Sequence, residues 1–124
     1  NDKQKFICKN VFLKPSNDST AITSGLKQDR TYKIPIAHGE GRFFAQEDGL
    51  KKIQDNDQII FTYCNEDGSV SNESNPNGSL LNIAGISNKS KNVFGMMPHP
   101  ERAADAELGN MDGKLIIESL LNYC

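Results

Sequence analysis

The segment 58-QIIFTYC-64 gives the clearest strand signal in the chain. It is rich in β-branched and aromatic side chains, and Ile59, Phe61 and Tyr63 occupy alternate positions along it. The turn-forming residues 65-NEDG-68 follow it directly. We therefore expect a fold that is built on a β-sheet containing this strand.

A second strand lies within 30-RTYKIPIAHGEGRFF-44. Its apolar residues Tyr32, Ile34 and Ile36 are two apart, so one face of the strand is expected to be buried as far as the turn at residues 37–39. Pro35 has no N–H group, which favours a place at the edge of the sheet or a site of broken pairing.

Three more strands are predicted from apolar runs that polar turns separate. They are 5-KFICKNVFLKP-15, 82-NIAGISN-88 and 92-NVFGMMPH-99. Residues 69–79 are dominated by Asn, Ser, Gly and Pro and are expected to form a loop.

Two helices are expected. The first covers residues 46–57, with Leu50 and Ile53 on one side. A closing helix has Asp112 as its predicted N-cap, and its predicted inner side carries Leu115, Ile116, Leu120 and Leu121. An α/β sheet requires helices on both faces, and these two are few for the number of strands.

The length and composition favour one domain over residues 1–124. The net charge of -2 and the scattered lysines argue against a nucleic-acid surface. The apolar runs are far shorter than the roughly 20 residues that span a bilayer, so no membrane segment is expected. Three cysteines without C-x-x-C spacing favour reduced thiols in a cytoplasmic protein.

His99 and Glu101, within 94-FGMMPHPERA-103, are the first candidates for catalysis. Residues two apart point to the same side of an extended backbone, which Pro98 and Pro100 favour. A carboxylate beside an imidazole fixes its tautomer and favours its protonated form, as a general base requires. The pair would supply the base and the orienter of a catalytic triad, although an isolated H-x-E is more often structural or exposed.

His38 and Glu40 form a second H-x-E pair. Together the two pairs could hold a divalent metal ion, as in a metal-dependent hydrolase. Gly39 and Gly41 favour instead a tight turn whose backbone N–H groups approach a ligand. A Gly-rich hairpin with a solvated histidine is the third interpretation.

None of the three cysteines has the sequence context of a nucleophile. Cys8 lies inside a predicted strand, Cys64 ends one, and Cys124 is the last residue. A catalytic cysteine in an α/β protein is expected on a strand-to-helix elbow flanked by glycines. We therefore interpret each as a core or surface residue rather than an attacking group.

Several motifs occur in one order along the chain: 34-IPIAHGEGRFF-44, 75-NPNGS-79, 82-NIAGI-86 and 92-NVFGMMPHPERA-103, followed by 108-LGNMDGKLIIESLL-121. In this order the sequence resembles the C-terminal half of the glutaminase subunits of phosphoribosylformylglycinamidine synthase. These subunits are class I glutamine amidotransferases of purine biosynthesis. The resemblance runs from residue 5 to the end of the chain.

The resemblance implies an α/β fold, the C-terminal part of a flavodoxin-like sheet, strand-rich with a closing helix. It implies a Cys-His-Glu triad in which His99 is the general base and Glu101 orients it. A cysteine thiolate attacks the side-chain amide of glutamine, and water hydrolyses the resulting thioester to glutamate. The backbone around Ala37, His38 and Gly39 is implied to hold the α-carboxylate and amino group of glutamine.

The resemblance also implies a protein partner, the synthetase subunit that receives the ammonia. ATP and Mg²⁺ are expected on that subunit, and no cofactor is expected in this chain. Residues 75–79 and Arg102 are implied to face the pocket or the synthetase. A turn around Pro76 and an ordinary surface arginine are the alternatives.

The sequence departs from the family in one respect, because it contains no G-x-C-N-G-type nucleophile segment. We therefore expect the C-terminal portion of a longer domain, which alone would be inactive. The alternative is a complete, non-catalytic binding module of the same fold. A parallel sheet without its early strands would expose an apolar edge, so self-association is also expected.

Overall fold

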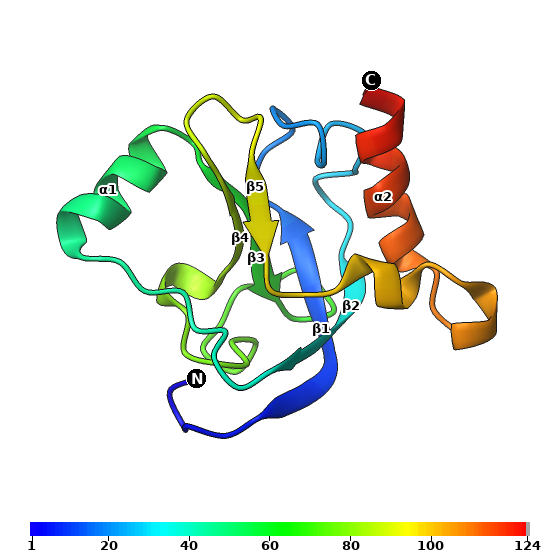
Figure 1. The fold of residues 1–124 in the computed structure, drawn as a ribbon, viewed down its shortest axis with the longest axis horizontal. Helices are drawn as coiled ribbons and strands as arrows, with labels where there is room; N and C mark the ends of the chain where they lie inside the picture. The colour runs from blue at the N-terminus through cyan, green and yellow to red at the C-terminus, as the bar shows by residue number, and fades with distance from the viewer. Residues whose placement is uncertain (124) are drawn as a thin grey trace.

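The computed structural model describes residues 1–123, which form one five-stranded sheet and two α-helices. The sheet has the order β2-β1-β3-β4-β5. Its strands are β1 (Ile7–Pro15), β2 (Tyr32–His38), β3 (Ile59–Cys64), β4 (Ile83–Ser87) and β5 (Phe94–Met96). Figure 1 shows the helices α1 and α2 on opposite flanks of this sheet. The prediction of a strand-rich α/β chain with a closing helix is confirmed.

The expected parallel pairing is wrong, because every pairing in the sheet of residues 1–123 is antiparallel. Parallel neighbours require a crossover of a dozen or more residues, usually a helix. Here β4 and β5 are joined by a short polar turn, and the connection from β1 to β2 contains no helix. The exposed parallel edge from which we expected self-association is therefore not present in this form.

The prediction for β2 is confirmed. Tyr32, Ile34 and Ile36 are buried, and β2 pairs only with β1 at one edge of the sheet. The carbonyl oxygen of Pro35 accepts a hydrogen bond of 2.9 Å from the backbone N–H of His99. Because His99 comes shortly after β5, this bond joins the segment beyond one edge strand to the other edge strand, and the sheet curls.

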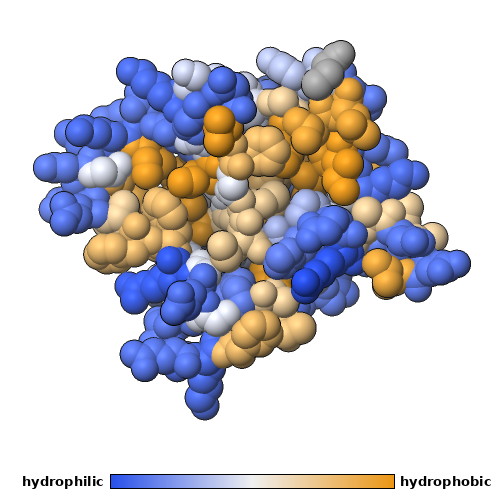
Figure 2. All heavy atoms as spheres, in the orientation of Figure 1, coloured by the Kyte–Doolittle hydropathy of each residue, from blue (hydrophilic) through white to orange (hydrophobic). Residues whose placement is uncertain are grey.

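The core lies on both sides of β3, where Ile60, Phe61, Tyr63 and Cys64 are all buried. Side chains from the other strands and from α2 complete the cluster, among them Leu13, Ile34 and Ile116. In Figure 2 hydrophobic atoms gather over the middle of one face and over α2, whereas the atoms over α1 are largely hydrophilic.

Helix α1 (Glu47–Asp55) occupies the predicted position and contains no buried residue. Leu50 and Ile53 are partly exposed on its inner side. Three short 3₁₀ helices follow in the chain: η1 (Leu80–Asn82), η2 (Pro100–Ala103) and η3 (Ala106–Leu108). None of the helices formed by residues 1–123 has the length and apolar character needed to cross a membrane.

Helix α2 (Asp112–Tyr123) confirms the predicted inner side in part, because Ile116 is buried and Leu115 packs against the core. Its buried residues are Gly113, Ile116 and Ser119, whereas Leu121 is 67% exposed. Small residues let the helix approach its neighbours closely, and the Ser119 hydroxyl accepts a hydrogen bond of 2.8 Å from the N–H of Gly25. A pattern of large apolar residues alone could not reveal this contact face.

Candidate active site

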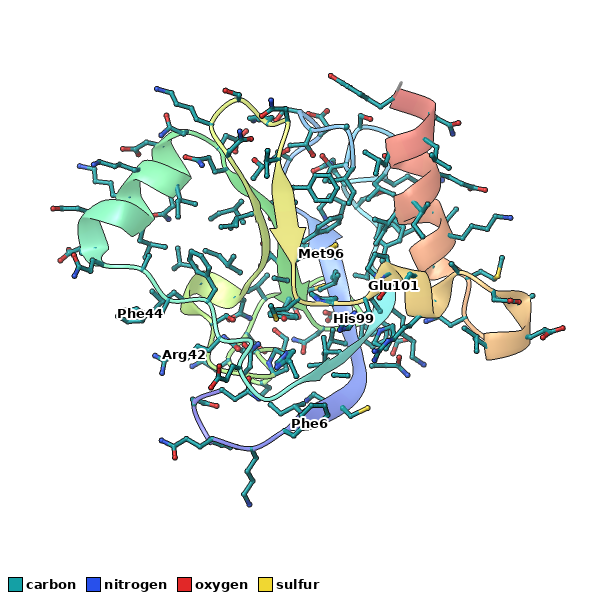
Figure 3. All side chains as sticks on the ribbon, in the orientation of Figure 1. Phe6, Arg42, Phe44, Met96, His99 and Glu101 are labelled. Atoms are coloured by element: carbon teal, nitrogen blue, oxygen red, sulfur yellow. The ribbon has the colours of Figure 1, made fainter. Side chains whose placement is uncertain are left out.

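His99 and Glu101 lie side by side at the end of the segment that follows β5 (Figure 3). The Nδ1 atom of His99 is 2.9 Å from the Oε1 atom of Glu101. The side chain of His99 is 31% exposed and that of Glu101 is 62% exposed, so both can be reached from solvent. The buried ring of Pro98 and the bond from His99 to Pro35 anchor the segment from beneath. The predicted pair is therefore assembled.

The backbone that brings the pair together is a helical turn rather than the predicted extended segment. Pro100 is the first residue of η2, where its fixed φ and missing N–H are compatible with a helix start. The N–H of Arg102 donates to the carbonyl oxygen of His99 at 3.1 Å, which closes the turn. Glu101 thus reaches the imidazole around a turn of η2.

The environment keeps Glu101 ionised. Desolvation raises the pKa of this carboxyl group, but its own backbone N–H, the His99 imidazole and the charge of Arg102 together outweigh that effect and lower the pKa. An ionised carboxylate only accepts hydrogen bonds, so Nδ1 of His99 must donate. In the neutral ring Nε2 then carries the free lone pair, as a general base requires.

The edge of β2 next to His99 presents backbone groups. The N–H of Lys33 donates to Oδ2 of Asp112 at 2.8 Å, and its carbonyl oxygen accepts from Nδ2 of Asn110 at 2.7 Å. Both groups therefore point away from β1. In an antiparallel pair this direction repeats every second residue, so the N–H and carbonyl of Ala37 point to the same edge.

These contacts also correct the prediction that Asp112 is an N-cap. Asp112 is the first residue of α2, and its carboxylate accepts from Lys33 and from Nη2 of Arg30 at 3.2 Å. The side chain of Asn110 instead accepts a hydrogen bond of 3.1 Å from the N–H of Asp112. A carboxylate at a helix start suggested local capping, and only the tertiary structure could show that it binds β2.

His38 turns its side chain into the interior, where it is 8% exposed. The side-chain oxygen of Asn77 accepts from the N–H and hydroxyl of Ser79 at 3.1 and 2.7 Å, which directs its amide nitrogen toward Nε2 of His38 at 3.4 Å. Nε2 is therefore the acceptor, and the proton of the neutral ring lies on Nδ1. Burial lowers the pKa of His38, with smaller electrostatic effects from the N-terminal ammonium and His99. The Nδ1 atom is buried and has no hydrogen-bond partner in the described structure.

The His38 ring explains why glycine occupies position 41. A Cβ atom on Gly41 would lie 2.5 to 2.6 Å from three atoms of that ring. The amide nitrogen of Asn77 also donates to the carbonyl oxygen of Gly41 at 2.9 Å. Asn77 and Ser79 are buried, so this part of the predicted 75–79 segment supports residues 38–41 from inside the protein.

The metal-site alternative is wrong. It requires His38, Glu40, His99 and Glu101 to lie together, but no group of three or more His, Cys, Asp or Glu side chains within residues 1–123 could hold a metal ion. The buried His38 ring and the exposed Glu40 point to different environments.

The cysteines agree with their predicted structural roles where the structure describes them. Cys64 is buried, and burial together with the charge of Asp67 raises the pKa of its thiol to about 11, against the opposing effect of Lys14. Cys8 is exposed on β1 opposite Ala37. Cys124 lies outside the described residues. No hydrogen bond or ion pair joins Cys8 or Cys64 to His99 within the part of the chain that the structure describes.

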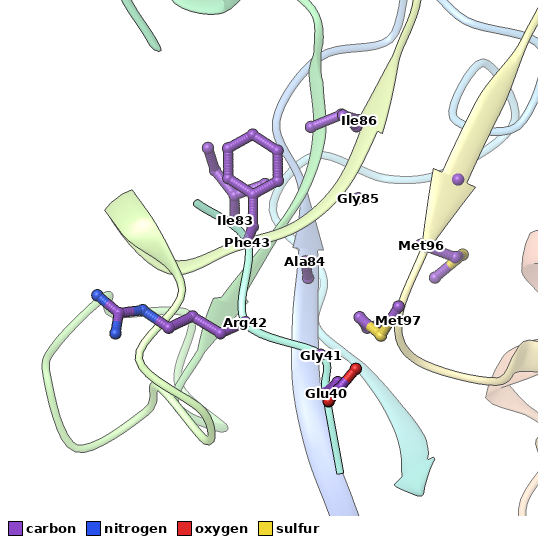
Figure 4. Close-up of a pocket in the computed structure, with 11 residues that line it drawn as sticks. Glu40, Gly41, Arg42, Phe43, Ile83, Ala84, Gly85, Ile86, Met96 and Met97 are labelled. Atoms are coloured by element: carbon purple, nitrogen blue, oxygen red, sulfur yellow. The ribbon is translucent and has the colours of Figure 1, made fainter. Parts of the chain in front are cut away.

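A pocket of about 340 Å³ lies beside the candidate site and was not predicted (Figure 4). Residues 40–43 form one wall, and β4, β5 and Met97 form the other. The paired strands β4 and β5 line the pocket with the small residues Ala84, Gly85 and Gly95, and a Cβ atom on Gly95 would meet no atom within 4 Å. These small residues are the sequence signal that could have indicated the pocket. The pocket shares residues 40 and 41 with the AHGEG segment, but His99 and Glu101 do not line it.

Comparisons with known proteins show the family to which the chain belongs. A sequence model of the CobB/CobQ-like glutamine amidotransferase domain matches residues 1–114. The chain is 53% identical over 120 residues to phosphoribosylformylglycinamidine synthase subunit PurQ of Chlorobium chlorochromatii, covering 97% of this chain and 51% of that protein. It is 49% identical over 122 residues to the PurQ subunit of Aquifex aeolicus, covering 98% of this chain and 54% of that protein.

Among solved structures, the chain is similar to a chain in the structure of PurLQS from Thermotoga maritima. The TM-score is 0.78 at 40% identity, and the match covers 99% of this chain and 50% of that chain. The chain thus spans about half the length of the curated relatives it matches. The resemblance inferred from the sequence motifs is confirmed, and the chain belongs to the family of CobB/CobQ-like glutamine amidotransferase domains.

Proposed function

We propose that this chain supplies the general base of a glutaminase, and that the protein acts as the glutaminase component of a phosphoribosylformylglycinamidine synthase. The observation that carries the proposal is the 2.9 Å contact between His99 Nδ1 and Glu101 Oε1 beside the open edge of β2. The similarity to PurQ subunits supports glutamine as the substrate and purine biosynthesis as the pathway.

In the proposed reaction Nε2 of His99 takes the proton of a cysteine thiol. The sulfur bonds to the side-chain carbonyl carbon of glutamine, the carbon–nitrogen bond breaks, and His99 gives the proton to the leaving ammonia. Water, deprotonated by the same imidazole, then hydrolyses the thioester and releases glutamate. Glu101 stays ionised, accepts the hydrogen bond from the Nδ1–H group throughout, and stabilises the imidazolium form.

The attacking cysteine is proposed to come from outside this chain's described residues. Cys64 is excluded by its burial and its raised pKa, and Cys8 forms no described hydrogen bond with His99. The relatives are about twice as long as this chain, and we place the nucleophile in the part of their length that this chain does not match. The chain alone is then expected to have no glutaminase activity.

The backbone of residues 37–39 is proposed to hold the α-carboxylate and amino group of glutamine. The N–H and carbonyl groups of Ala37 point to the β2 edge that His99 adjoins, so one donor and one acceptor lie on the correct side. The His38 ring is buried against Gly41, and its carbonyl oxygen accepts a hydrogen bond of 3.0 Å from the side chain of Asn1, so His38 would position its neighbours rather than bind glutamine directly. Gly39 leaves the loop free of a side chain at this position.

The ammonia is proposed to pass to a synthetase subunit, which would hold ATP and Mg²⁺. Support comes from the word subunit in the names of the relatives and from the neighbouring PurLQS structure. Arg102, which is exposed beside Glu101, is a candidate contact for that subunit.

Replacing His99 by alanine in the intact protein, assayed with its synthetase, tests the proposal. Glutamine-dependent synthesis should fall at least about 100-fold, the usual contribution of a general base, while ammonia-dependent synthesis persists. Lys114→Ala on the exposed side of α2 is the matched control and should retain both activities.

Unchanged use of glutamine by the His99→Ala protein would remove His99 from the mechanism. If the intact protein contained no cysteine able to approach His99, the chain would instead be a non-catalytic binding module. The sequence of the complete gene and the intact mass of the purified protein decide that question.

A further inference from the structure

The first turn of α2 lies directly on the turn that carries the proposed base. A Cβ atom on Gly113 would overlap the carbonyl oxygen of Pro100 and lie 2.7 and 2.9 Å from its carbonyl carbon and Cα. These are backbone atoms of the residue between His99 and Glu101, so they cannot move aside as a flexible side chain would. Figure 3 shows this end of α2 next to the labelled pair. Only glycine permits this approach.

The residues just before Gly113 bind the same turn of α2 to β2. Asp112 and Asn110 together occupy both backbone groups of Lys33, at 2.8 and 2.7 Å. Arg30 holds the other oxygen of Asp112 at 3.2 Å. The start of α2 is thereby fixed to the sheet edge by the side chains of Asp112, its first residue, and Asn110, which precedes it.

The edge of β2 also holds His99. Pro35, two residues beyond Lys33, accepts the N–H of His99 at 2.9 Å. Three segments therefore fix one another in a closed frame: the β2 edge, the turn from His99 to Glu101, and the start of α2. Displacement of any one would change the distance between the His99 ring and the backbone of Ala37.

We infer that Asn110, Asp112 and Gly113 are positioning residues for the general base. They do not touch the reacting atoms, and they act by holding the turn of His99 and Glu101 at a set distance from the β2 edge. This inference rests on the proposed glutaminase function.

Gly113→Ala in the intact protein with its synthetase is the first test. The added methyl must push the turn of His99 outward, and a displacement of about 1 Å can lower the rate of the chemical step about 100-fold. The kcat for glutamine should fall by that factor while KM changes less than about threefold, because β1 and Asn77 hold residues 37–41 independently. Lys114→Ala, on the same turn of α2, should leave kcat unchanged.

Asp112 provides a second test that does not depend on the fold tolerating a methyl group at position 113. Asp112→Ala removes the acceptor for Lys33 and should lower kcat about tenfold, with KM again nearly constant. Asp112→Asn keeps a carbonyl oxygen for that N–H and should restore most of the activity. If Asp112 had only a structural role, its replacement would lower the thermal unfolding midpoint but would not lower kcat at constant KM.

The inference is overturned if folded Gly113→Ala or Asp112→Ala protein retains the parent kcat, or if KM rises as much as kcat falls. Its failure is distinguishable from failure of the proposed function. If His99→Ala abolishes glutamine use but these variants do not, only the positioning role is lost. If His99→Ala retains glutamine use, the glutaminase proposal itself is wrong.

Discussion

Asn77→Asp should reverse the way in which His38 links stability to pH. Asn77 is fully buried, and its amide nitrogen faces two acceptors, the carbonyl oxygen of Gly41 at 2.9 Å and Nε2 of His38 at 3.4 Å. In the variant, one oxygen of the carboxylate introduced at position 77 can still accept the hydrogen bonds from the N–H and hydroxyl groups of Ser79. The other oxygen of this carboxylate then opposes the carbonyl oxygen of Gly41, and it also opposes Nε2 of His38 unless that nitrogen carries a proton.

The cost follows from these contacts. The Gly41 carbonyl loses its donor in a buried site, which costs about 1–3 kcal/mol, and the new carboxylate is buried without a cation, which adds several kcal/mol more. We expect Asn77→Asp to lower the free energy of unfolding by roughly 3–5 kcal/mol near pH 8. For each unit by which the pKa of His38 rises in the variant, the free energy of unfolding at low pH increases by about 1.4 kcal/mol.

The sign of the pH effect differs between the two proteins. In the parent, burial holds the pKa of His38 below its ordinary value of 6.5, so the unfolded chain binds more protons and stability from this group falls as pH drops below that value. In the variant, the carboxylate raises the pKa of His38 above 6.5. The stability that protonated His38 contributes in the variant is fully present below the ordinary pKa of 6.5, and it is lost as pH rises through the raised pKa of His38.

Urea unfolding of the intact protein, followed by circular dichroism between about pH 5.5 and 8, measures the difference. The gap in unfolding free energy between parent and Asn77→Asp should narrow as pH falls. Asn122→Asp, which adds the same charge on the exposed side of α2, should show almost no gap. A gap that stays constant or widens toward low pH would refute the assigned tautomer and the buried contact.

Three further predictions follow from single side chains. Glu101→Gln should lower kcat for glutamine at least about 100-fold, whereas Glu107→Gln on η3 should leave kcat unchanged. Because the pKa of Glu101 is lowered, the difference in kcat between the parent and Glu101→Gln should persist down to pH values below the ordinary 4.5. An alkylating reagent at mildly alkaline pH should label Cys8 and spare Cys64 in the native protein, as peptide mass analysis can show, because the pKa of the Cys64 thiol is about 11. Ser87→Ala removes a buried hydroxyl without a hydrogen-bond partner in the described structure, so its unfolding free energy should stay level or rise by up to about 1 kcal/mol; a clear loss would contradict that.

Patterns that depend on neighbouring residues in the sequence were predictable. The alternation of Tyr32, Ile34 and Ile36 correctly indicated the buried face of β2, and the missing N–H of Pro35 correctly indicated an edge. The H-P-E spacing correctly predicted that the side chains of His99 and Glu101 lie together, although a helical turn rather than an extended backbone joins them. In these cases the local chemistry allows few alternatives.

Features that depend on contacts between distant segments were not predictable in the same way. The buried face of α2 is set by Gly113 meeting Pro100 and by Ser119 meeting Gly25, and a small residue carries no hydrophobic signal. The carboxylate of Asp112 could bind its own helix or another strand, and only the fold decides between them. The turn that joins His99 to Glu101 belongs to η2, and it likewise depends on the contact between Pro100 and Gly113 of α2.

The hydrogen bond between His99 and Pro35 connects residues at the two ends of the strand order. The base reaches its place only when these two distant segments meet, and such non-local closure is slow. During refolding, the recovery of glutamine use should coincide with the last kinetic phase and never precede it. Under the proposed function, an intact protein that has not yet closed its sheet would release no free ammonia.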